Sequence, residues 1–178
     1  MLGPSAHIDT FARDNLPAVD LLPDFKLGRF RYPEKLNAGY ELTDAMVEKG
    51  FGDHTALIGN GRQRTYKELA DWTNRLAHVL KDDLGIVPGN RVLIRSANNP
   101  AMVACWLAAT KVGAVVVNTM PMLRAHELQK YVEKAEISHA LSDKRLIDEM
   151  QKCAENCKSL RTVVGFDGSS NHDAELDR

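Results

Sequence analysis

The cysteines Cys153 and Cys157 are the first residues whose types and spacing could do chemistry. A four-residue spacing places both on one face of a helix, as two metal ligands would require. A zinc site needs further Cys or His ligands, and no second cysteine pair or nearby histidine pair completes one. The same spacing continues an apolar stripe with Leu146 and Met150. We therefore interpret both thiols as core residues and predict no metal site.

Motifs for phosphate binding and for nucleophilic catalysis are absent from the sequence. The glycines never fall at the G-x-G-x-x-G spacing of dinucleotide-binding folds, and the Gly/Ser-rich "GSSN" is not followed by the lysine of a P-loop. No serine stands in G-x-S-x-G, and no Cys or His belongs to a recognisable nucleophile pair. By spacing alone, we assign no catalytic residue.

The most apolar stretch of the chain covers residues 98–121. A membrane-spanning helix needs about 20 apolar residues, and Lys111 and Gly113 interrupt this stretch. We predict instead a buried helix, with Asn99 as its N-cap and Gly113 as its stop, in which Trp106 and Leu107 pack against a sheet. A strand at 115–117 follows, and its continuous valines are typical of a strand covered on both faces.

The rest of the pattern alternates strands with helices. A hairpin is predicted at 55–66 because Asn60 and Gly61 suit a tight turn, and the spacing of Thr65 and Glu68 predicts a capping box for the next helix. Further strands are expected at 91–96, 139–142 and 161–166, and further helices at 125–138 and at 143–157, the last capped by Asp143. This order builds a parallel sheet by right-handed crossovers. The predicted fold class is α/β, a mostly parallel sheet with flanking helices.

Three segments differ in composition. Residues 1–42 contain Pro4, Pro17, Pro23 and Pro33, which break any long period, so we predict an irregular N-terminal arm. Residues 43–167 carry the α/β pattern, and residues 168–178 are polar and acidic, as in a solvated loop or linker.

Charge and composition limit the partners and the compartment. The 23 basic residues balance 24 acidic ones, without a basic run, which disfavours nucleic acid as a partner. The charged residues Asp9, Arg13 and Asp14 interrupt the region where a secretory signal would be apolar, so we expect a cytoplasmic protein. An odd number of cysteines, three, agrees with reduced thiols.

Several short motifs resemble the N-terminal part of the AMP-forming acyl-CoA synthetases, the adenylate-forming superfamily. They are "TYKEL" at 65–69, "PGN" at 88–90, "NNP" at 98–100, "KVGAV" at 111–115 and "EL" at 127–128. The strings "AHIDTFARDNLP", "RYPEKLN" and "VVNTMPMLRAHEL" are most similar to the benzoate-CoA and 2-aminobenzoate-CoA ligase branch. One departure is Asn90, a turn position where most relatives have Asp.

The resemblance implies an ATP-dependent ligase that joins an aromatic carboxylic acid to coenzyme A, with ATP, CoA and Mg²⁺ as substrates or cofactor. It implies the incomplete first part of the family's large N-terminal domain, because the phosphate loop, the ribose-binding Asp and the catalytic lysine lie beyond the matched region. We therefore expect the 178 residues alone to be inactive, and to self-associate through apolar surface and an open sheet edge.

One basic residue has a candidate binding role. In some aryl-CoA ligases a basic residue in the loop after the shared proline contacts a phosphate of CoA. Here that position is Met122, and Arg124 follows two residues later. Because a guanidinium can bind phosphate through two hydrogen bonds, we predict Arg124 as a CoA contact.

Two other functions remain open from the residues. The chain could be an interaction or regulatory module that keeps the scaffold without catalysis. It could also be an unrelated doubly wound binding domain of the flavodoxin-like type, which would need a ligand crevice at the carboxyl ends of its strands.

Overall fold

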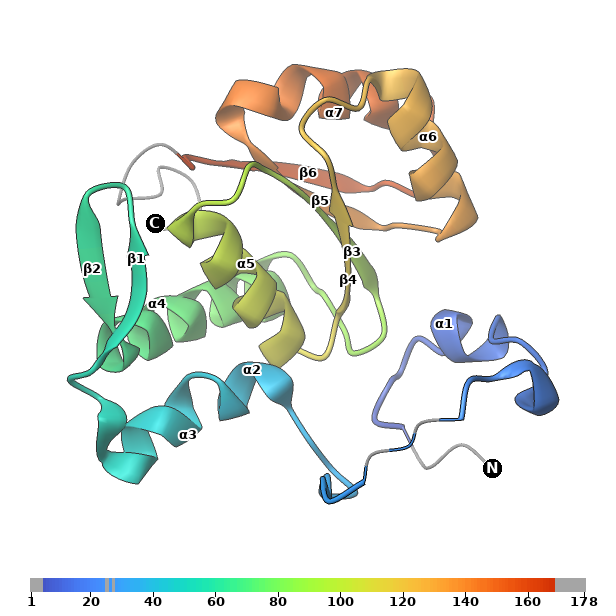
Figure 1. Ribbon diagram of the computed structural model, residues 1–178. Coiled ribbons are helices and arrows are strands. Elements are labelled where there is room, and N and C mark those ends of the chain that lie inside the picture. Colours follow the sequence, from blue (N-terminus) through green and yellow to red (C-terminus); the bar gives the residue numbers. More distant parts are fainter. Residues whose placement is uncertain (1–4, 25, 27, 169–178) are drawn as a thin grey trace.

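A parallel sheet forms the centre of the molecule. The structure is a computed structural model that describes residues 5–24, 26 and 28–168. In this part of the chain the strands lie in the order β4-β3-β5-β6, and each runs parallel to its neighbours (Figure 1). Their bounds are Arg91–Arg95 for β3, Val115–Thr119 for β4, His139–Asp143 for β5 and Thr162–Phe166 for β6. The predicted α/β class with a parallel sheet is confirmed.

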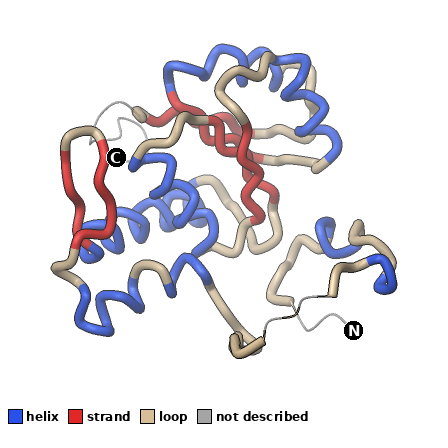
Figure 2. Tube along the Cα trace, in the orientation of Figure 1, coloured by secondary structure: helices blue, strands red, loops and turns tan. Residues whose placement is uncertain are grey.

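Helices cover both faces of this sheet (Figure 2). The helices α4 (Tyr66–His78) and α5 (Pro100–Lys111) lie on one face, and α6 (Ala125–Lys134) and α7 (Ile147–Ala154) on the other. Alternate side chains of β3 pack against the helices on one face of the sheet and on the other, because successive side chains of a strand point to opposite faces. Val92 and Ile94 pack with α4 and α5, whereas Leu93 packs with α6 and α7.

The hairpin and the helix that follows form as predicted. Strands β1 (Thr55–Gly59) and β2 (Arg62–Thr65) are antiparallel, and their turn residues Asn60 and Gly61 have φ of 52° and 72°. Both halves of the capping box are present: Glu68 N–H donates to Thr65 Oγ1 at 3.2 Å, and Thr65 N–H donates to Glu68 Oε2 at 2.9 Å.

The remaining helical segments are short. They are α1 (Phe11–Asp14), η1 (Val19–Leu21), α2 (Ala38–Glu41), α3 (Asp44–Met46), η2 (Val47–Phe51), η3 (Val79–Asp83) and η4 (Lys144–Leu146). Asp143 Oδ1 accepts a hydrogen bond of 3.0 Å from Arg145 N–H. The predicted cap at Asp143 therefore starts the single turn η4, and α7 begins only at Ile147.

The boundaries of the apolar stretch are confirmed, but its strand is not covered as predicted. Asn99 Oδ1 accepts from Met102 N–H at 2.8 Å, and Gly113 ends the helix with φ of 79°. Among the described strands, however, β4 is outermost, so the valines at 115–117 are only half-buried. The fully buried strands are β3 and β5, because each has a neighbour on both sides.

The burial prediction for α5 is half right. Leu107 is 5% exposed, as expected of a core residue. Trp106 packs against the same core cluster but is only half-buried, so the prediction that it is buried is wrong. It lies on the side of α5 that faces the outermost strand, where no further strand of the described chain closes over it.

The N-terminal arm contacts the sheet at the start of β3. Ile8 and Asp9 donate their N–H groups to Pro88 O at 2.9 and 3.0 Å, and the Asp9 carboxylate pairs with the buried Arg91 guanidinium. Further along, α2 packs against α5, and Asn37 Nδ2 donates to Lys111 O at 2.8 Å. The predicted polar tail, 168–178, lies outside the described residues except for Gly168.

None of the helices in the part of the chain that the structure describes combines the length and the apolar character needed to cross a bilayer.

Candidate functional site

Arg124, the predicted CoA contact, stands immediately before the first turn of α6. Its side chain is 71% exposed, so the guanidinium is open to solvent and to a ligand. The Arg124 N–H donates to Glu127 Oε2 at 2.9 Å, which fixes the backbone at the start of the helix. A phosphate could therefore reach this cation without displacing a buried group.

A carboxylate from the neighbouring helix α7 lies beside Arg124. Glu149 Oε1 is 3.9 Å from Arg124 Nη1, and Glu149 Oε2 accepts the N–H of Ala125 at 2.9 Å. The hydrogen bond from Ala125 and the contact with Lys152 lower the pKa of Glu149, so it is ionised at neutral pH. A phosphate at Arg124 would have to compete with this carboxylate. No local sequence pattern indicates this pairing, because Glu149 is 25 positions away from Arg124.

Arg95, at the end of β3, holds the loop that carries Arg124. Its guanidinium is 2% exposed and donates to Met120 O (3.3 Å), Pro121 O (2.9 Å), Leu123 O (2.7 Å) and Leu146 O (3.3 Å). Burial lowers the pKa of Arg95, but an arginine stays charged in proteins. Sequence reasoning missed this residue. A charged side chain that directly follows the apolar run 92–94, at the carboxyl end of the strand, is the signal that could have found it.

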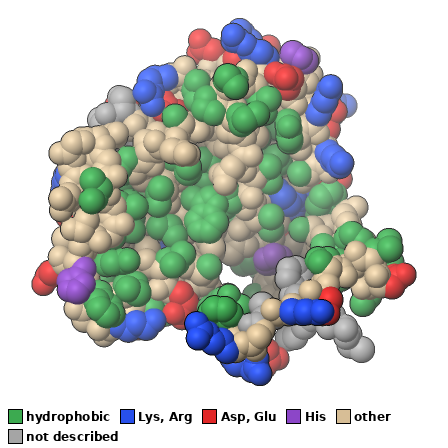
Figure 3. Space-filling view, in the orientation of Figure 1, with side chains coloured by type: hydrophobic (Ala, Val, Ile, Leu, Met, Phe, Trp, Pro, Cys, Tyr) green, Lys and Arg blue, Asp and Glu red, His purple; other side chains and the backbone are tan. Residues whose placement is uncertain are grey.

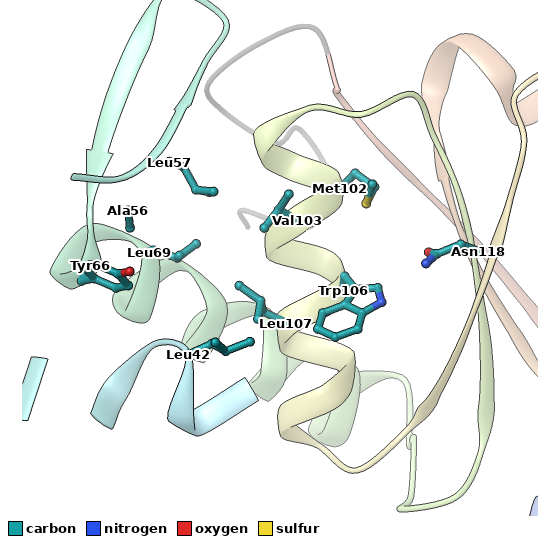
Figure 4. A pocket seen from close by; sticks show the side chains of 10 residues that line it. All are labelled: Leu42, Ala56, Leu57, Tyr66, Leu69, Met102, Val103, Trp106, Leu107 and Asn118. Atoms are coloured by element: carbon teal, nitrogen blue, oxygen red, sulfur yellow. The ribbon is translucent and has the colours of Figure 1, made fainter. Parts of the chain in front are cut away.

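An apolar hollow of about 400 Å³ lies between α5, the β1–β2 hairpin and β4. Trp106 points from α5 toward Asn118 of β4, and Met102 lies one helical turn away (Figure 4). The other lining residues are Leu42, Ala56, Leu57, Tyr66, Leu69, Val103 and Leu107. This lining suits an apolar group and offers no charged side chain.

The carboxyl ends of β3 and β5 are where a doubly wound domain would bind its ligand, because the chain order reverses there. In this structure the chain itself occupies the position beyond those ends. A Cβ built on Gly168 would be 2.3 Å from Asp143 Oδ2 and 2.5 Å from Asn99 Nδ2, and Asn60 Nδ2 donates to Gly168 O at 3.3 Å. This filled position argues against the flavodoxin-like alternative.

The cysteines are core residues, as predicted. Cys153 and Cys157 belong to the cluster between the sheet and the helices α6 and α7, and their Sγ atoms are 3.8 Å apart. Burial, together with the neighbouring thiol, raises the pKa of Cys153 to about 12. A thiol with this pKa is a poor nucleophile and a poor metal ligand at neutral pH.

The curated relatives that match the chain include several CoA ligases. The chain is 28% identical over 121 residues to a 3-oxocholest-4-en-26-oate–CoA ligase of Rhodococcus rhodochrous, covering 68% of this chain and 22% of that protein. It is 33% identical over 98 residues to a 3-hydroxybenzoate–CoA ligase of Aromatoleum sp. (strain CIB), covering 55% of this chain and 18% of that protein. The chain therefore spans about a fifth of the length of these relatives.

Solved structures share the fold. An anthranilate CoA ligase, AuaEII, in complex with anthranoyl-AMP superposes with a TM-score of 0.66 at 17% identity, over 71% of this chain and 24% of that chain. A benzoate CoA ligase from Burkholderia xenovorans LB400 superposes with a TM-score of 0.65 at 20% identity, over 74% of this chain and 26% of that one.

A family model described as AMP-binding enzyme matches residues 45–177, from within α3 to beyond the last strand of the sheet. The match covers all the strands and main helices described above. This chain belongs to the AMP-binding enzyme family.

Proposed function

We propose that the chain forms the first α/β part of an ATP-dependent ligase that joins an aromatic carboxylic acid to coenzyme A. The observation that carries the proposal is the family match over residues 45–177. Relatives at 33% and 34% identity that act on 3-hydroxybenzoate, or on 3- and 4-hydroxybenzoate, support an aromatic substrate. The benzoate and 2-aminobenzoate branch, suggested by the sequence strings, is the narrower form of the proposal.

The proposed reaction has two steps. The substrate carboxylate attacks the α-phosphate of ATP, which enters as its Mg²⁺ complex, and pyrophosphate leaves as the acyl-adenylate forms. The CoA thiol, losing its proton, then attacks the acyl carbon and displaces AMP. Both steps depend on positioning the reactants and on stabilising the charge that develops on phosphate and carbonyl oxygens.

The residues that stabilise those charges are proposed to lie outside these 178 residues. Arg124 is the one binding residue that we assign within them. Its 71% exposed guanidinium, on a loop held in place by Arg95, supports a contact with a phosphate of CoA. Because Glu149 lies 3.9 Å away, we expect this contact to be of modest strength.

Carboxylate-dependent exchange between pyrophosphate and ATP tests the proposal. The 178-residue chain is assayed beside the product of the complete reading frame, with benzoate and 2-aminobenzoate. We expect exchange from the complete product and none above a buffer blank from the 178-residue chain. Exchange by the short chain would overturn the assignment of the catalytic residues to other parts of the protein. No exchange by either product, with any benzoate derivative, would overturn the ligase proposal.

A matched pair of variants in the complete product tests the role of Arg124. Arg124→Ala should raise the KM for CoA several-fold and leave the exchange step, which precedes CoA binding, unchanged. Arg75→Ala is the control, since Arg75 is an exposed arginine of α4, on the other face of the sheet from α6. Equal KM values for CoA in the two variants would show that Arg124 does not contact CoA.

A further inference from the structure

Two cations from different segments converge on one carboxylate oxygen. Glu149 Oε1 lies 3.9 Å from Nη1 of Arg124, which directly precedes α6, and 3.0 Å from Nζ of Lys152, on α7. Glu149 and Lys152 are three positions apart on α7, a spacing that places both side chains on the same face of the helix. The two cations therefore reach the same point from two directions of the chain, and the carboxylate oxygen occupies that point.

The other oxygen of this carboxylate has a donor of its own. Glu149 Oε2 accepts the N–H of Ala125 at 2.9 Å. This hydrogen bond and the one from Lys152 lower the pKa of Glu149, so the group is an anion at neutral pH. Two cations and one backbone donor thus hold an anion that belongs to the protein itself. Together they have the composition of an anion-binding site, which Glu149 fills.

The site lies on a hydrated, charged part of the surface. Charged side chains of both signs gather over α6 and α7, at the top of the view, whereas hydrophobic ones gather over α5 and β4 (Figure 3). The side chains of Arg124 and Lys152 are exposed, and that of Glu149 is 19% exposed. Glu127, a second carboxylate in contact with Arg124, binds its backbone N–H rather than its guanidinium. A ligand can therefore reach both cations from solvent.

A third cation lies close enough to interact with this site. Burial lowers the pKa of Arg95, the charge of Glu149 opposes that shift, and the charge of Arg124 adds to it. Positive charge from Arg95 and Arg124 is therefore concentrated around the one carboxylate of Glu149. If Glu149 moved away, another anion would be needed to balance these charges.

We propose that the 3′-phosphate of CoA replaces the Glu149 carboxylate, with Arg124 and Lys152 as its two cations. A phosphomonoester carries a charge of about −2 and three terminal oxygens, one for each cation and one for the N–H of Ala125. Each phosphate of the diphosphate bridge has fewer free oxygens and less charge. Glu149 turns toward solvent as the phosphate enters. The inference rests on the proposed function and adds Lys152 to the contact assigned to Arg124.

Glu149 then sets how tightly CoA binds. Its carboxylate occupies the position of the phosphate and repels a second anion, so every binding event includes its displacement. Glu149→Gln removes the charge and keeps a side-chain oxygen that can accept the N–H of Ala125. The phosphate would then replace a neutral group. CoA should therefore bind more tightly to this variant, whereas truncation of a residue that contacts CoA should weaken binding.

Titration calorimetry of the complete product with CoA, without ATP or carboxylic acid, tests the inference. Lys152→Ala should raise the Kd about three-fold or more, and Glu149→Gln should lower it by a similar factor. Lys158→Ala is the control, since Lys158 is an exposed lysine beyond the other end of α7. Damage to the fold would weaken binding in both variants, so opposite signs exclude a merely structural role.

Three results would overturn the inference. They are an equal Kd for Lys152→Ala and Lys158→Ala, no tightening in Glu149→Gln, and no binding of CoA by the unmodified product. Dephospho-CoA, which lacks the 3′-phosphate, identifies the phosphate, because the variants should all bind it alike. If they differed as they do with CoA, the assignment to the 3′-phosphate would be wrong.

Failure of the ligase proposal is visible separately. Carboxylate-dependent exchange between pyrophosphate and ATP does not involve CoA, so its absence would count against the ligase while the differences in CoA binding persist. Exchange without those differences would overturn the phosphate site alone. A further check uses the double variant Arg124→Ala with Lys152→Ala, in which Glu149→Gln should no longer tighten CoA binding. Tightening that persists there would show that Glu149 does not act through these two cations.

Discussion

The side-chain amide of Asn90 donates a hydrogen bond of 2.9 Å to the carboxylate of Asp9, 81 positions earlier in the chain. The same carboxylate pairs with Arg91, whose guanidinium lies 4.5 Å from the centre of the Phe11 ring. Asn90 Oδ1 also accepts the N–H of Val87 at 3.1 Å, so one side chain joins the turn before β3 to the arm. An aspartate at this position could not donate to Asp9. The departure from the family pattern at Asn90 thus has a structural reason in this chain.

Asp9→Asn should loosen the arm and destabilise the protein by about 1–3 kcal/mol, because the buried Arg91 loses its charged partner. Burial alone would raise the pKa of Asp9, but hydrogen bonds from Arg91, Phe11 N–H and Asn90 lower it below 3.8. The stabilisation is therefore present above that value and is lost as the pH falls through the lower, folded pKa. Urea unfolding of both proteins at several pH values measures this. A difference that stays constant into strong acid would contradict it.

Asn90→Asp should release the arm at neutral pH, because two carboxylates would then face each other beside Arg91. The exchange variant Asp9→Asn with Asn90→Asp restores one donor and one acceptor and should recover much of the loss. Limited proteolysis within the arm is the measurement. If the double variant is cleaved as fast as Asn90→Asp alone, the contact with Asp9 is not the cause.

Arg95→Met should cost roughly 2–4 kcal/mol, since the carbonyl groups that the guanidinium holds would be left buried without a donor. Arg124→Met, on the same loop but 71% exposed, should change stability by no more than about 0.5 kcal/mol. Denaturant midpoints give both values, and hydrogen exchange of the amides at 120–124 should quicken only in the Arg95 variant. Equal effects of the two variants would show that Arg95 does not hold the loop.

Leu107→Ala should destabilise the protein by roughly 2–5 kcal/mol, because a side chain that is 5% exposed leaves a cavity when it is truncated. Trp106→Ala should lower the free energy of unfolding by less than the truncation of a fully buried tryptophan would. Trp106 is half-buried and lies beside a hollow that is already open. Denaturant unfolding curves of the two variants and the unmodified chain, recorded at the same protein concentration, measure these effects. A greater loss for Trp106 than for Leu107 would contradict the assigned burial.

The cysteine thiols should not react with a disulfide reagent near pH 8 until the protein unfolds. Cys153 has its pKa raised to about 12, chiefly by burial, so its reactive thiolate is scarce. Cys105 and Cys157 are 1% and 3% exposed and are shielded by packing. Thiol titration with and without denaturant measures this, and rapid labelling of the native chain would contradict it.

Sequence patterns predicted the parts of the fold that depend on local signals. Asn99, Gly113, Thr65 and Glu68 act on their own helix ends, and each structural role was visible within a few residues. Strand order was not visible, because it depends on contacts between distant segments. The three valines of β4 suggested a strand covered on both faces, but they are only half-buried, whereas the structure fully buries β5, whose "HALSD" is mostly polar.

In the candidate site too, local sequence signals point to some residues and contacts between distant segments bring in the others. Arg124 was selected because it follows a recognisable loop; the structure places it on the surface, and its contact with CoA stays a prediction. Glu149 could not be found, since it reaches the site from another helix. Arg95 was missed because it acts through backbone oxygens, and its charge at the end of a strand was the only signal. Interactions of these kinds leave no regular spacing in the sequence.

Arg95 holds the loop after β4 by main-chain oxygens alone, and every amino acid supplies the same oxygen. The side chains of Met120 and Met122 are thus not needed for the shape of that loop. A change at either position alters what the surface offers to a partner or ligand without altering where the loop lies. The side chains of this loop can therefore change during evolution while the path of its backbone is kept. A single buried residue on another strand, Arg95, is enough to keep it.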